Sequence, residues 1–302
     1  MIICCGEALI DMLPRTTPAN ESAFAPYAGG AVFNTAIALG RLGTPVQFIS
    51  GLSSDLFGDV LRDVLAQSHV DTTPCHVSDR PTTLAFVRLT DGHASYAFYD
   101  ENTAGRMLTP ADLPAVSADA LFFGGISLVV EPCGEAYKAL MLREAPQRLT
   151  MIDPNIRPGF ITDEAAYRDR LAAMLAVADI VKISDEDLSW LTGGCDPTAL
   201  LGDSATQVVL LTRGADGVTV ATRHSRFDVG ATRATVVDTV GAGDTFNAGF
   251  LAGLDQAGLL TKAGVTAATD DQLRAAASLG ARAAAITVAR AGANPPWAHE
   301  LG

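Results

Sequence analysis

The stretch Asp238-Thr-Val-Gly-Ala-Gly-Asp-Thr-Phe-Asn-Ala-Gly-Phe250 combines a glycine-rich turn, a carboxylate and an apolar run. Gly241 and Gly243 can take backbone angles that most residues avoid. The apolar run that begins at Phe246 predicts a buried helix, and the first turn of a helix has backbone N–H groups without internal partners. These groups and the helix dipole attract an anion. The stretch therefore predicts an anion-binding helix start.

Asp244 stands where that anion would lie, and its carboxylate would repel a bound phosphate. We expect that Asp244 is there for its chemistry. In this interpretation it takes a proton from an alcohol, while the N–H groups hold the phosphoryl group that the alcohol attacks. In the plain alternative, Asp244 only caps the helix. This stretch alone does not separate the two.

The composition excludes several classes of protein. A length of 302 residues favours one large α/β domain with a small appendage. The net charge is −13, and the three lysines are scattered, so we expect no nucleic-acid partner. We find no apolar run of about 18 residues, the length that would span a membrane. The first strand begins at Ile2, so we expect no secretory leader and a cytoplasmic location.

The five cysteines are scattered and show no CxxC spacing. Free thiols in a reducing compartment fit this pattern best. Cys4 and Cys5 lie in an apolar run and are expected in the core. The five histidines form no pair at the spacing of metal ligands.

Strand and helix signals alternate along most of the chain. Strands are predicted at 1–6, 46–51, 120–125, 149–153, 180–183 and 208–212, and the last pairs with 218–222 as a hairpin. Helices are predicted at 29–43, 55–67, 132–143, 164–176, 185–191, after Asp244 and at 271–286. Near-continuous apolar strands predict a parallel sheet that is covered on both faces. Ligands bind such sheets at the carboxyl ends of the strands, where we find Asp11, Gly125, Asp153, Lys182 and Thr212.

Two segments depart from this alternation. Residues 83–99 predict a β-hairpin that turns on Asp91-Gly92. Residues 12–27 are polar and turn-rich, without a helical period. We expect both segments, about 12–27 and 82–105, to form a small sheet at one edge of the core.

Three common phosphate and catalytic motifs are absent. The chain has no GxxxxGK[ST] loop and no GxSxG elbow. The Gly241-Ala-Gly243 turn does not extend to GxGxxG, because Phe246 stands where the third glycine belongs. A dinucleotide site is therefore disfavoured.

Residues 238–250 resemble the C-terminal signature of the ribokinase-like (PfkB) carbohydrate kinase family. The stretch Gly29-Gly-Ala-Val-Phe-Asn-Thr-Ala-Ile-Ala-Leu-Gly-Arg-Leu-Gly43 resembles its N-terminal signature. The two lie in the family's order, and the likeness extends over nearly all of residues 1–302, most to fructokinase members. The resemblance implies a three-layer α/β core with a mostly parallel sheet and a small β-sheet lid. It also implies transfer of the γ-phosphoryl group of ATP to a sugar hydroxyl.

Carried over position by position, the resemblance implies roles for individual residues. Asp244 would be the catalytic base, and residues 241–244 would form the anion hole, through the N–H groups of Gly241, Ala242 and Gly243. Sugar-binding groups would be Asp11, Gly29, Gly30, Asn34, Phe98 and Arg157. Nucleotide-binding groups would be Lys182, Ser184, Thr212, Gly214, Gly217, Gly241 and Gly243. The plain alternatives are turn or cap roles for Asp11, the glycine pair and Asn34, a hairpin turn at 212–217, and a surface ion pair for Arg157.

The chain departs from the family pattern near the expected metal. The family often has an N-x-x-E motif, and Ser184 and Asp187 stand at the corresponding positions. The shorter Asp187 would hold Mg²⁺ through water. Magnesium is also expected on physical grounds, because phosphates need charge neutralisation. By resemblance, a monovalent cation such as K⁺ would bind near Asp238 and the loop after Val288, and two copies would pair through the exposed lid into a homodimer.

The sequence favours fructose as the sugar substrate. Residues 98–108 and 124–128 look most like fructokinase members. Relatives that phosphorylate 2-keto-3-deoxygluconate tend to carry an arginine near Tyr99; here Asp100 would repel a carboxylate, unless Arg106 turns inward with the lid. Ribokinases usually have a lysine where this chain has Ala31. A non-catalytic sugar or nucleotide sensor on the same fold is the alternative outside enzymes, but a sensor has no need of Asp244.

Overall fold

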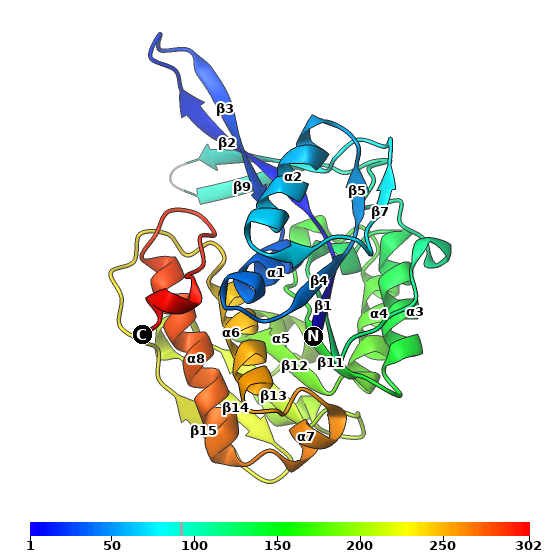
Figure 1. Cartoon of the computed structure of the whole chain (residues 1–302), viewed down its shortest axis with the longest axis vertical. Coiled ribbons are helices and arrows are strands. Elements are labelled where there is room, and N and C mark those ends of the chain that lie inside the picture. The colour runs from blue at the N-terminus through cyan, green and yellow to red at the C-terminus, as the bar shows by residue number, and fades with distance from the viewer. Residues whose placement is uncertain (91–92) are drawn as a thin grey trace.

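A nine-stranded sheet runs through the computed structural model, which describes residues 1–90 and 93–302 (Figure 1). Its strand order is β15-β14-β13-β12-β11-β10-β1-β4-β6. All neighbours pair in parallel except β13 with β14 and β14 with β15. In chain order the strands are β1 (Ile2–Cys5), β4 (Val46–Ile49), β6 (Val70–Asp71), β10 (Ala120–Gly124), β11 (Leu149–Asp153), β12 (Ile180–Ser184), β13 (Val208–Thr212), β14 (Val218–Thr222) and β15 (Arg226–Val229).

Helices cover both faces of this sheet, because successive residues of each buried strand point to opposite sides. In β1, Ile2 and Cys4 join one apolar cluster, and Ile3 and Cys5 join the other. The first cluster packs against α1 (Ala31–Arg41), α2 (Leu56–Gln67), α6 (Ala242–Gln256), α7 (Lys262–Ala267) and α8 (Asp270–Val288). The second packs against α3 (Cys133–Glu144), α4 (Glu164–Val177) and α5 (Asp185–Thr192). The predicted three-layer α/β core is confirmed, and Cys4 and Cys5 lie inside it.

The small second sheet is confirmed as part of the fold, and it projects from one end of the core (Figure 1). Its order is β3-β2-β8-β9, from strands β2 (Leu9–Thr16), β3 (Ser22–Gly29), β8 (Leu84–Thr90) and β9 (His93–Tyr99). The turn predicted at Asp91-Gly92 lies outside the described residues. Strand β2 begins only a few residues after β1 ends, so the small sheet stands over the carboxyl ends of the core strands.

The predicted elements differ from the observed ones mainly at their ends, by one or two residues. The short elements were not predicted, because two to six residues are too few to show a period. These are β6, β15, α7, and the separate pair β5 (Gly51–Ser53) and β7 (His76–Ser78). Six 3-10 turns complete the described elements: η1 (Pro110–Asp112), η2 (Ile126–Leu128), η3 (Pro158–Phe160), η4 (Pro197–Leu200), η5 (Gly214–Asp216) and η6 (Ala298–Glu300).

Helix α6 packs closely on α8, and this fixes where its first turn lies. A side chain on Gly249 would place its Cβ 2.6 Å from the Cα of Gly280, and one on Gly253 would lie 2.7 Å from the Cα of Ala276. Only glycine allows the two backbones to approach this closely. Over the part of the chain that the structure describes, no helix is both long and apolar enough to cross a membrane.

Candidate active site

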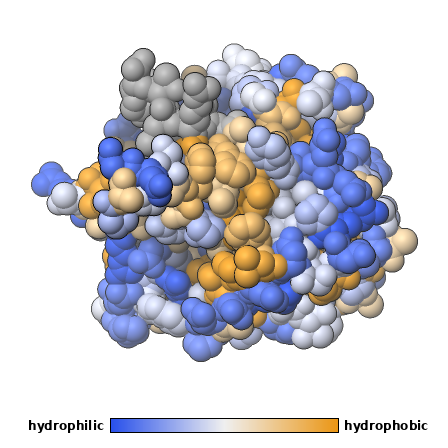
Figure 2. Space-filling model, turned by 90° about the horizontal axis from the view of Figure 1, so that it is seen from above, coloured by the Kyte–Doolittle hydropathy of each residue, from blue (hydrophilic) through white to orange (hydrophobic). Residues whose placement is uncertain are grey.

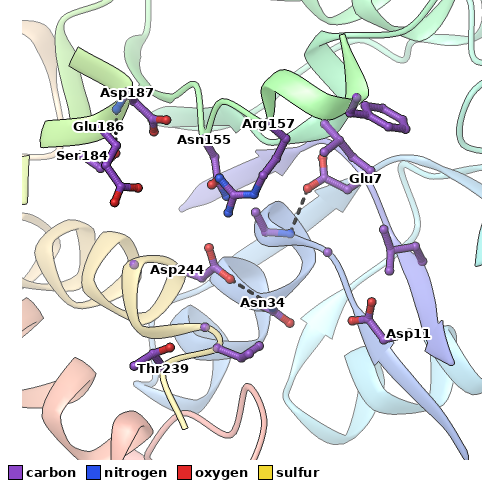
Figure 3. A pocket seen from close by; sticks show the side chains of 18 of the residues that line it. Glu7, Asp11, Asn34, Asn155, Arg157, Ser184, Glu186, Asp187, Thr239 and Asp244 are labelled. Carbon is purple, nitrogen blue, oxygen red and sulfur yellow. Dashed lines mark hydrogen bonds between the residues drawn. The ribbon is translucent and has the colours of Figure 1, made fainter. Parts of the chain in front are cut away.

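A cavity of about 810 Å³ lies at the carboxyl ends of the core strands, as the strand pattern predicted for a ligand site. The core contributes Glu7, Lys182 and Thr212, and the small sheet contributes Asp11 and Phe98. In Figure 3, Asp11 and Glu7 lie to one side of Asp244, and Ser184 and Glu186 lie to the other. The helix start that the sequence singled out therefore stands in the middle of the cavity.

Asp244 is the third residue of α6 and does not cap it. The N-cap position belongs to Gly241, whose φ of 77° is left-handed. A side chain at Gly241 would also place its Cβ 2.7 Å from the Cβ of Ala293. Both the backbone angle and the close neighbour therefore require glycine at this position. The N–H of Ala242 donates to the carbonyl oxygen of Thr239 at 3.3 Å. Among the described residues, the N–H groups of Gly243 and Asp244 have no protein acceptor, which leaves them for an anion.

The carboxyl of Asp244 is almost fully buried, with 8% of the residue exposed. Burial raises its pKa to about 7, and the charges of Asp153 and Glu7 act in the same direction. The Nδ2 amide of Asn34 donates to Asp244 Oδ2 at 2.9 Å and, with Lys182, holds the pKa from rising further. A carboxylate of this pKa can accept a proton near neutral pH and release it again.

The predicted sugar-binding residues gather on the small-sheet side of Asp244. Asp11, Gly30, Asn34, Phe98 and Arg157 all line the cavity. Burial raises the pKa of Asp11 to about 6. Gly29 does not line the cavity directly. A side chain on Gly29 would lie 2.3 Å from Asp11 Oδ2, so the glycine makes room for that carboxylate.

Four of the predicted nucleotide-binding residues, Thr212, Gly214, Gly217 and Gly243, line a second cavity of about 650 Å³, whereas Gly241 lines only the first. The first turn of α6 and one face of α8 also line the second cavity. The two cavities share Thr212, Thr239 and Gly243. The start of α6 therefore faces both cavities.

Lys182 and Ser184, also predicted on the nucleotide side, line the first cavity and have protein partners. Lys182 is buried, and its Nζ donates to Asp153 Oδ2 at 2.8 Å, next to Gly243. Ser184 caps α5, because its Oγ accepts the N–H of Asp187 at 3.0 Å. Ser184 is therefore the N-cap of α5 as well as part of the cavity lining.

Acidic oxygens that suit a magnesium ion lie beside these residues. Glu186 and Asp187 line the cavity. Burial, and then the charge of Asp153, raises the pKa of Asp187 to about 6. The Oδ1 atom of Asp153 is buried without a hydrogen-bond partner in the described structure. Since Mg²⁺ usually takes one or two carboxylates, waters and phosphate oxygens, this donor set fits the ion. No cluster of three His, Cys, Asp or Glu side chains that could cage a metal occurs in residues 1–90 and 93–302.

Asp238 ties together the two segments where a monovalent cation was expected. Its Oδ1 accepts the N–H of Val240 at 3.0 Å, and its Oδ2 accepts the N–H of Gly292 at 2.9 Å. The N–H groups of Val237 and Asp238 both donate to the carbonyl oxygen of Val288. The segment before α6 and the segment after α8 are therefore adjacent.

Sequence reasoning missed several residues of the cavity. Glu7 and Glu186 sit among apolar or acidic neighbours without a motif of their own, and Phe160 carries no distinctive signal. Asn155 lines the cavity with a φ of 46°, and its place directly after a strand end was the only hint.

The expected roles of Asp100 and Arg106 need correction. Arg106 Nη1 contacts Asp100 Oδ2 at 3.1 Å, and Arg106 Nε donates to the carbonyl oxygen of Glu131 at 3.1 Å. Neither residue lines the cavity. In this structure the two side chains pair with each other outside the pocket, so neither is placed to contact a ligand there.

The buried charge of Asp244 predicts a stability effect. A carboxyl whose pKa is raised on folding keeps its proton in the folded state, so stability is lost as the pH rises from about 4 through 7. Asp244→Asn removes this loss. At pH 8 it should raise the melting temperature, and the gain in unfolding free energy should be at most about 4 kcal/mol. The gain should shrink as the pH falls toward 4. Exposed Asp169→Asn on α4 is the control. A variant that melts lower than wild type at pH 8 would contradict the burial argument.

Comparison with known proteins agrees with this geometry. The model of the pfkB family carbohydrate kinases matches residues 1–300. A fructokinase of Rhizobium leguminosarum bv. trifolii is 53% identical over 279 residues, which cover 91% of this chain and 86% of that protein.

Two solved structures show the same fold. A fructokinase from Xylella fastidiosa with bound ATP is similar with a TM-score of 0.89 at 32% identity, covering 99% of this chain and 96% of that one. A fructokinase from Vibrio cholerae O395, bound to fructose, ADP and a calcium ion, is similar with a TM-score of 0.83 at 25% identity. The match covers 97% of this chain and 94% of that one. With a family match over nearly its whole length and a catalytic carboxylate candidate at the start of α6, this chain belongs to the PfkB family of carbohydrate kinases.

Proposed function

We propose that this protein is an ATP-dependent fructokinase. One observation carries the proposal: a buried carboxylate and free backbone N–H groups meet where the two cavities join. The 53% identical relative is a fructokinase, and the similar solved structures hold ATP, or fructose with ADP. The sugar would occupy the cavity beside the small sheet, and ATP would occupy the one between α6 and α8.

Asp244 accepts the proton of the attacking sugar hydroxyl. As that O–H bond breaks, the oxygen forms a bond to the γ-phosphorus, and the bond from that phosphorus to the ADP oxygen breaks. The proton ends on Asp244, and ADP leaves with the electron pair. Asn34 holds the carboxylate at 2.9 Å, which keeps Oδ2 oriented and leaves Oδ1 to face the hydroxyl.

The start of α6 receives the charge that develops on the transferred group. Its free N–H groups at Gly243 and Asp244 and the positive end of the helix dipole act without rearrangement, and such groups lower reaction barriers by several kcal/mol in other enzymes. Lys182 adds a positive charge next to Gly243. Asp11 and Arg157 supply acceptor and donor groups to the other sugar hydroxyls.

Metal ions would complete the nucleotide side. Bound Mg²⁺ neutralises phosphate charge and orients the phosphoryl group. Glu186 and Asp187 would hold it through water. A monovalent cation such as K⁺ would bind near Asp238, beside the joined segments that flank α6 and α8.

The small sheet, residues 12–27 and 82–105, would act as a lid. Phe98 on the small sheet and Phe160 on the core both line the sugar cavity, and their ring centroids lie 4.6 Å apart. Closure over the sugar would exclude water and limit ATP hydrolysis.

The alternatives have less support from the structure. A 2-keto-3-deoxygluconate kinase needs a cation for the substrate carboxylate. Arg106 is engaged outside the cavity and Arg157 lines it, so the preference for fructose rests on the 53% identical relative, which is a fructokinase. The position of the ribokinase lysine is Ala31, whose N–H is bound to Glu7. A sensor would keep a buried carboxylate of raised pKa without a use for it.

Removing the proton acceptor should stop phosphoryl transfer. We expect Asp244→Asn to lower kcat with fructose by about 10²–10⁴-fold while fructose binding survives. Coupled ADP release measures turnover, and titration calorimetry measures binding. The sugar panel of fructose, ribose, 2-keto-3-deoxygluconate and nucleosides is run on the wild type, where fructose should give the highest kcat/KM. Turnover by the variant within threefold of wild type would remove Asp244 from the mechanism.

We also propose that two copies pair through the small sheet. Phe24, Tyr27 and Tyr99 expose 48%, 47% and 62% of their surfaces there, and the rings of Phe24 and Tyr99 both pack on Phe86. Figure 2 looks onto this end of the molecule and shows apolar residues gathered across the middle of the face, with polar residues around them. Exposed aromatic side chains gathered on one sheet, as Phe24, Tyr27 and Tyr99 are, are typical of an interaction surface.

Sedimentation tests this pairing. The wild type should sediment as a dimer at micromolar concentration, and the double variant Phe24→Ser, Tyr99→Ser should sediment as a monomer. Leu142→Ser on α3, which removes another exposed apolar side chain, should leave the dimer unchanged. A monomeric wild type, or a dimeric double variant, would refute pairing through this sheet.

A further inference from the structure

Glu7 is an acid of the sugar cavity that the mechanism above does not use. It follows β1 directly, lines the cavity and is 8% exposed (Figure 3). Its Oε1 accepts the N–H of Ala31 at 2.9 Å, and its Oε2 accepts the N–H of Ser127 at 3.2 Å. These are the first residue of α1 and the second residue of η2, so one carboxylate holds the starts of two helical segments.

Two glycines with positive φ make room for this carboxylate. Gly30, at φ 112°, would place a Cβ 3.0 Å from the carbonyl oxygen of Glu7 and 3.1 Å from its Cγ. Gly125, at φ 72°, would place a Cβ within 2.5 Å of all three atoms of the carboxylate group. Each glycine directly precedes the segment that Glu7 holds. The backbone on both sides is therefore shaped around the Glu7 side chain.

The charge of Glu7 is held by backbone N–H groups. No salt bridge to Glu7 occurs among the described residues. Burial raises the pKa of Glu7, and hydrogen bonds from its own backbone, from the side chain and N–H of Ser127 and from the N–H of Ala31 oppose the rise. A buried carboxylate costs stability unless hydrogen bonds compensate it. A glutamine could accept only one of the two N–H groups, because its other atom is a donor.

The two segments carry part of the wall of the sugar cavity. The α1 segment provides Gly30, Ala31 and Asn34, and Asn34 in turn holds Asp244. The η2 segment provides Ile126. A change in the separation of these segments would move the sugar relative to Asp244, and a shift of about 1 Å can cost a large part of the rate.

We propose that Glu7 is a positioning residue for the acceptor sugar: its carboxylate fixes the start of α1 and the 125–127 turn at the separation that brings a sugar hydroxyl to Asp244. This inference rests on the proposed sugar kinase function. It assigns Glu7 to the sugar and not to the nucleotide, because neither of its two partner segments lines the second cavity.

The test is Glu7→Gln, which keeps the size of the side chain and one acceptor. Loss of one hydrogen bond to a charged group should lower kcat/KM for fructose by about 10–100-fold, through a lower kcat as well as a higher KM for fructose. KM for ATP should stay within twofold. The rise in melting temperature caused by saturating fructose should shrink, and the rise caused by magnesium and ADP should not. Glu7→Asp keeps both acceptors on a shorter side chain and should recover part of the fructose KM.

Glu144→Gln is the matched control. Glu144 is also largely buried, with its side chain 13% exposed, but it binds Arg143 and Arg148 at the end of α3 and does not line the cavity. Equal changes in the fructose and ATP constants of Glu7→Gln, or no change in either, would overturn the positioning role while wild-type fructose phosphorylation stands. If Glu7→Gln does not fold, the fructose and ATP constants of Glu7→Asp are compared with those of the wild type instead. A wild type that phosphorylates no sugar of the panel would overturn the proposed function and this inference together.

Discussion

The hydrogen bond from Asn34 to Asp244 joins the two helices on which the site depends. In the proposed function, α1 brings groups that face the sugar, and α6 brings the turn that binds the phosphoryl group. Both helices pack on the same face of the sheet, and the glycine contacts of α6 with α8 fix its axial position. The two cavities share Thr212, Thr239 and Gly243, and Gly243 directly precedes Asp244 at the start of α6. In the proposed function, the Asn34–Asp244 contact therefore aligns the sugar, which accepts the phosphoryl group, with ATP, which donates it.

Acidic residues gather around this contact at a cost in stability. Glu7, Asp153, Asp187 and Asp244 are all buried. Burial raises the pKa of Asp244 and of Asp187, and the charge of Asp153 adds to both rises. Lys182 and Asn247 both donate to Asp153, and backbone N–H groups serve Glu7 and Asp187. Buried charges that cost stability are common at sites where function selects the residues. Here it gives one carboxylate a pKa near neutrality, while the neighbouring carboxylates form other contacts.

The sequence predicted the core and the centre of the site, because both follow local rules. Alternating apolar strands and helices predicted the three layers, and glycine spacing with the resemblance singled out Asp244 and Asn34. Residues that act through tertiary contacts were not predictable in this way. Glu7 serves two segments that follow it by 24 and 120 positions, and the Arg106 to Asp100 pair depends on how the chain folds outside the pocket. The polar 12–27 segment became strands only by pairing within the small sheet.

The pH dependence of wild-type kcat/KM for fructose tests the central claim, that Asp244 accepts the proton, most directly. The carboxylate must be ionised to act, and burial raises its pKa to about 7. The value of kcat/KM should therefore increase as the pH rises from about 5.5 and level off above about pH 7. The measurement is made at saturating magnesium and ATP, so that the profile reports ionisation of the nucleotide-bound enzyme, because the hydroxyls of fructose do not ionise in this range. A rate that is flat between pH 5.5 and 8, or that falls as the pH rises through this range, would contradict the account.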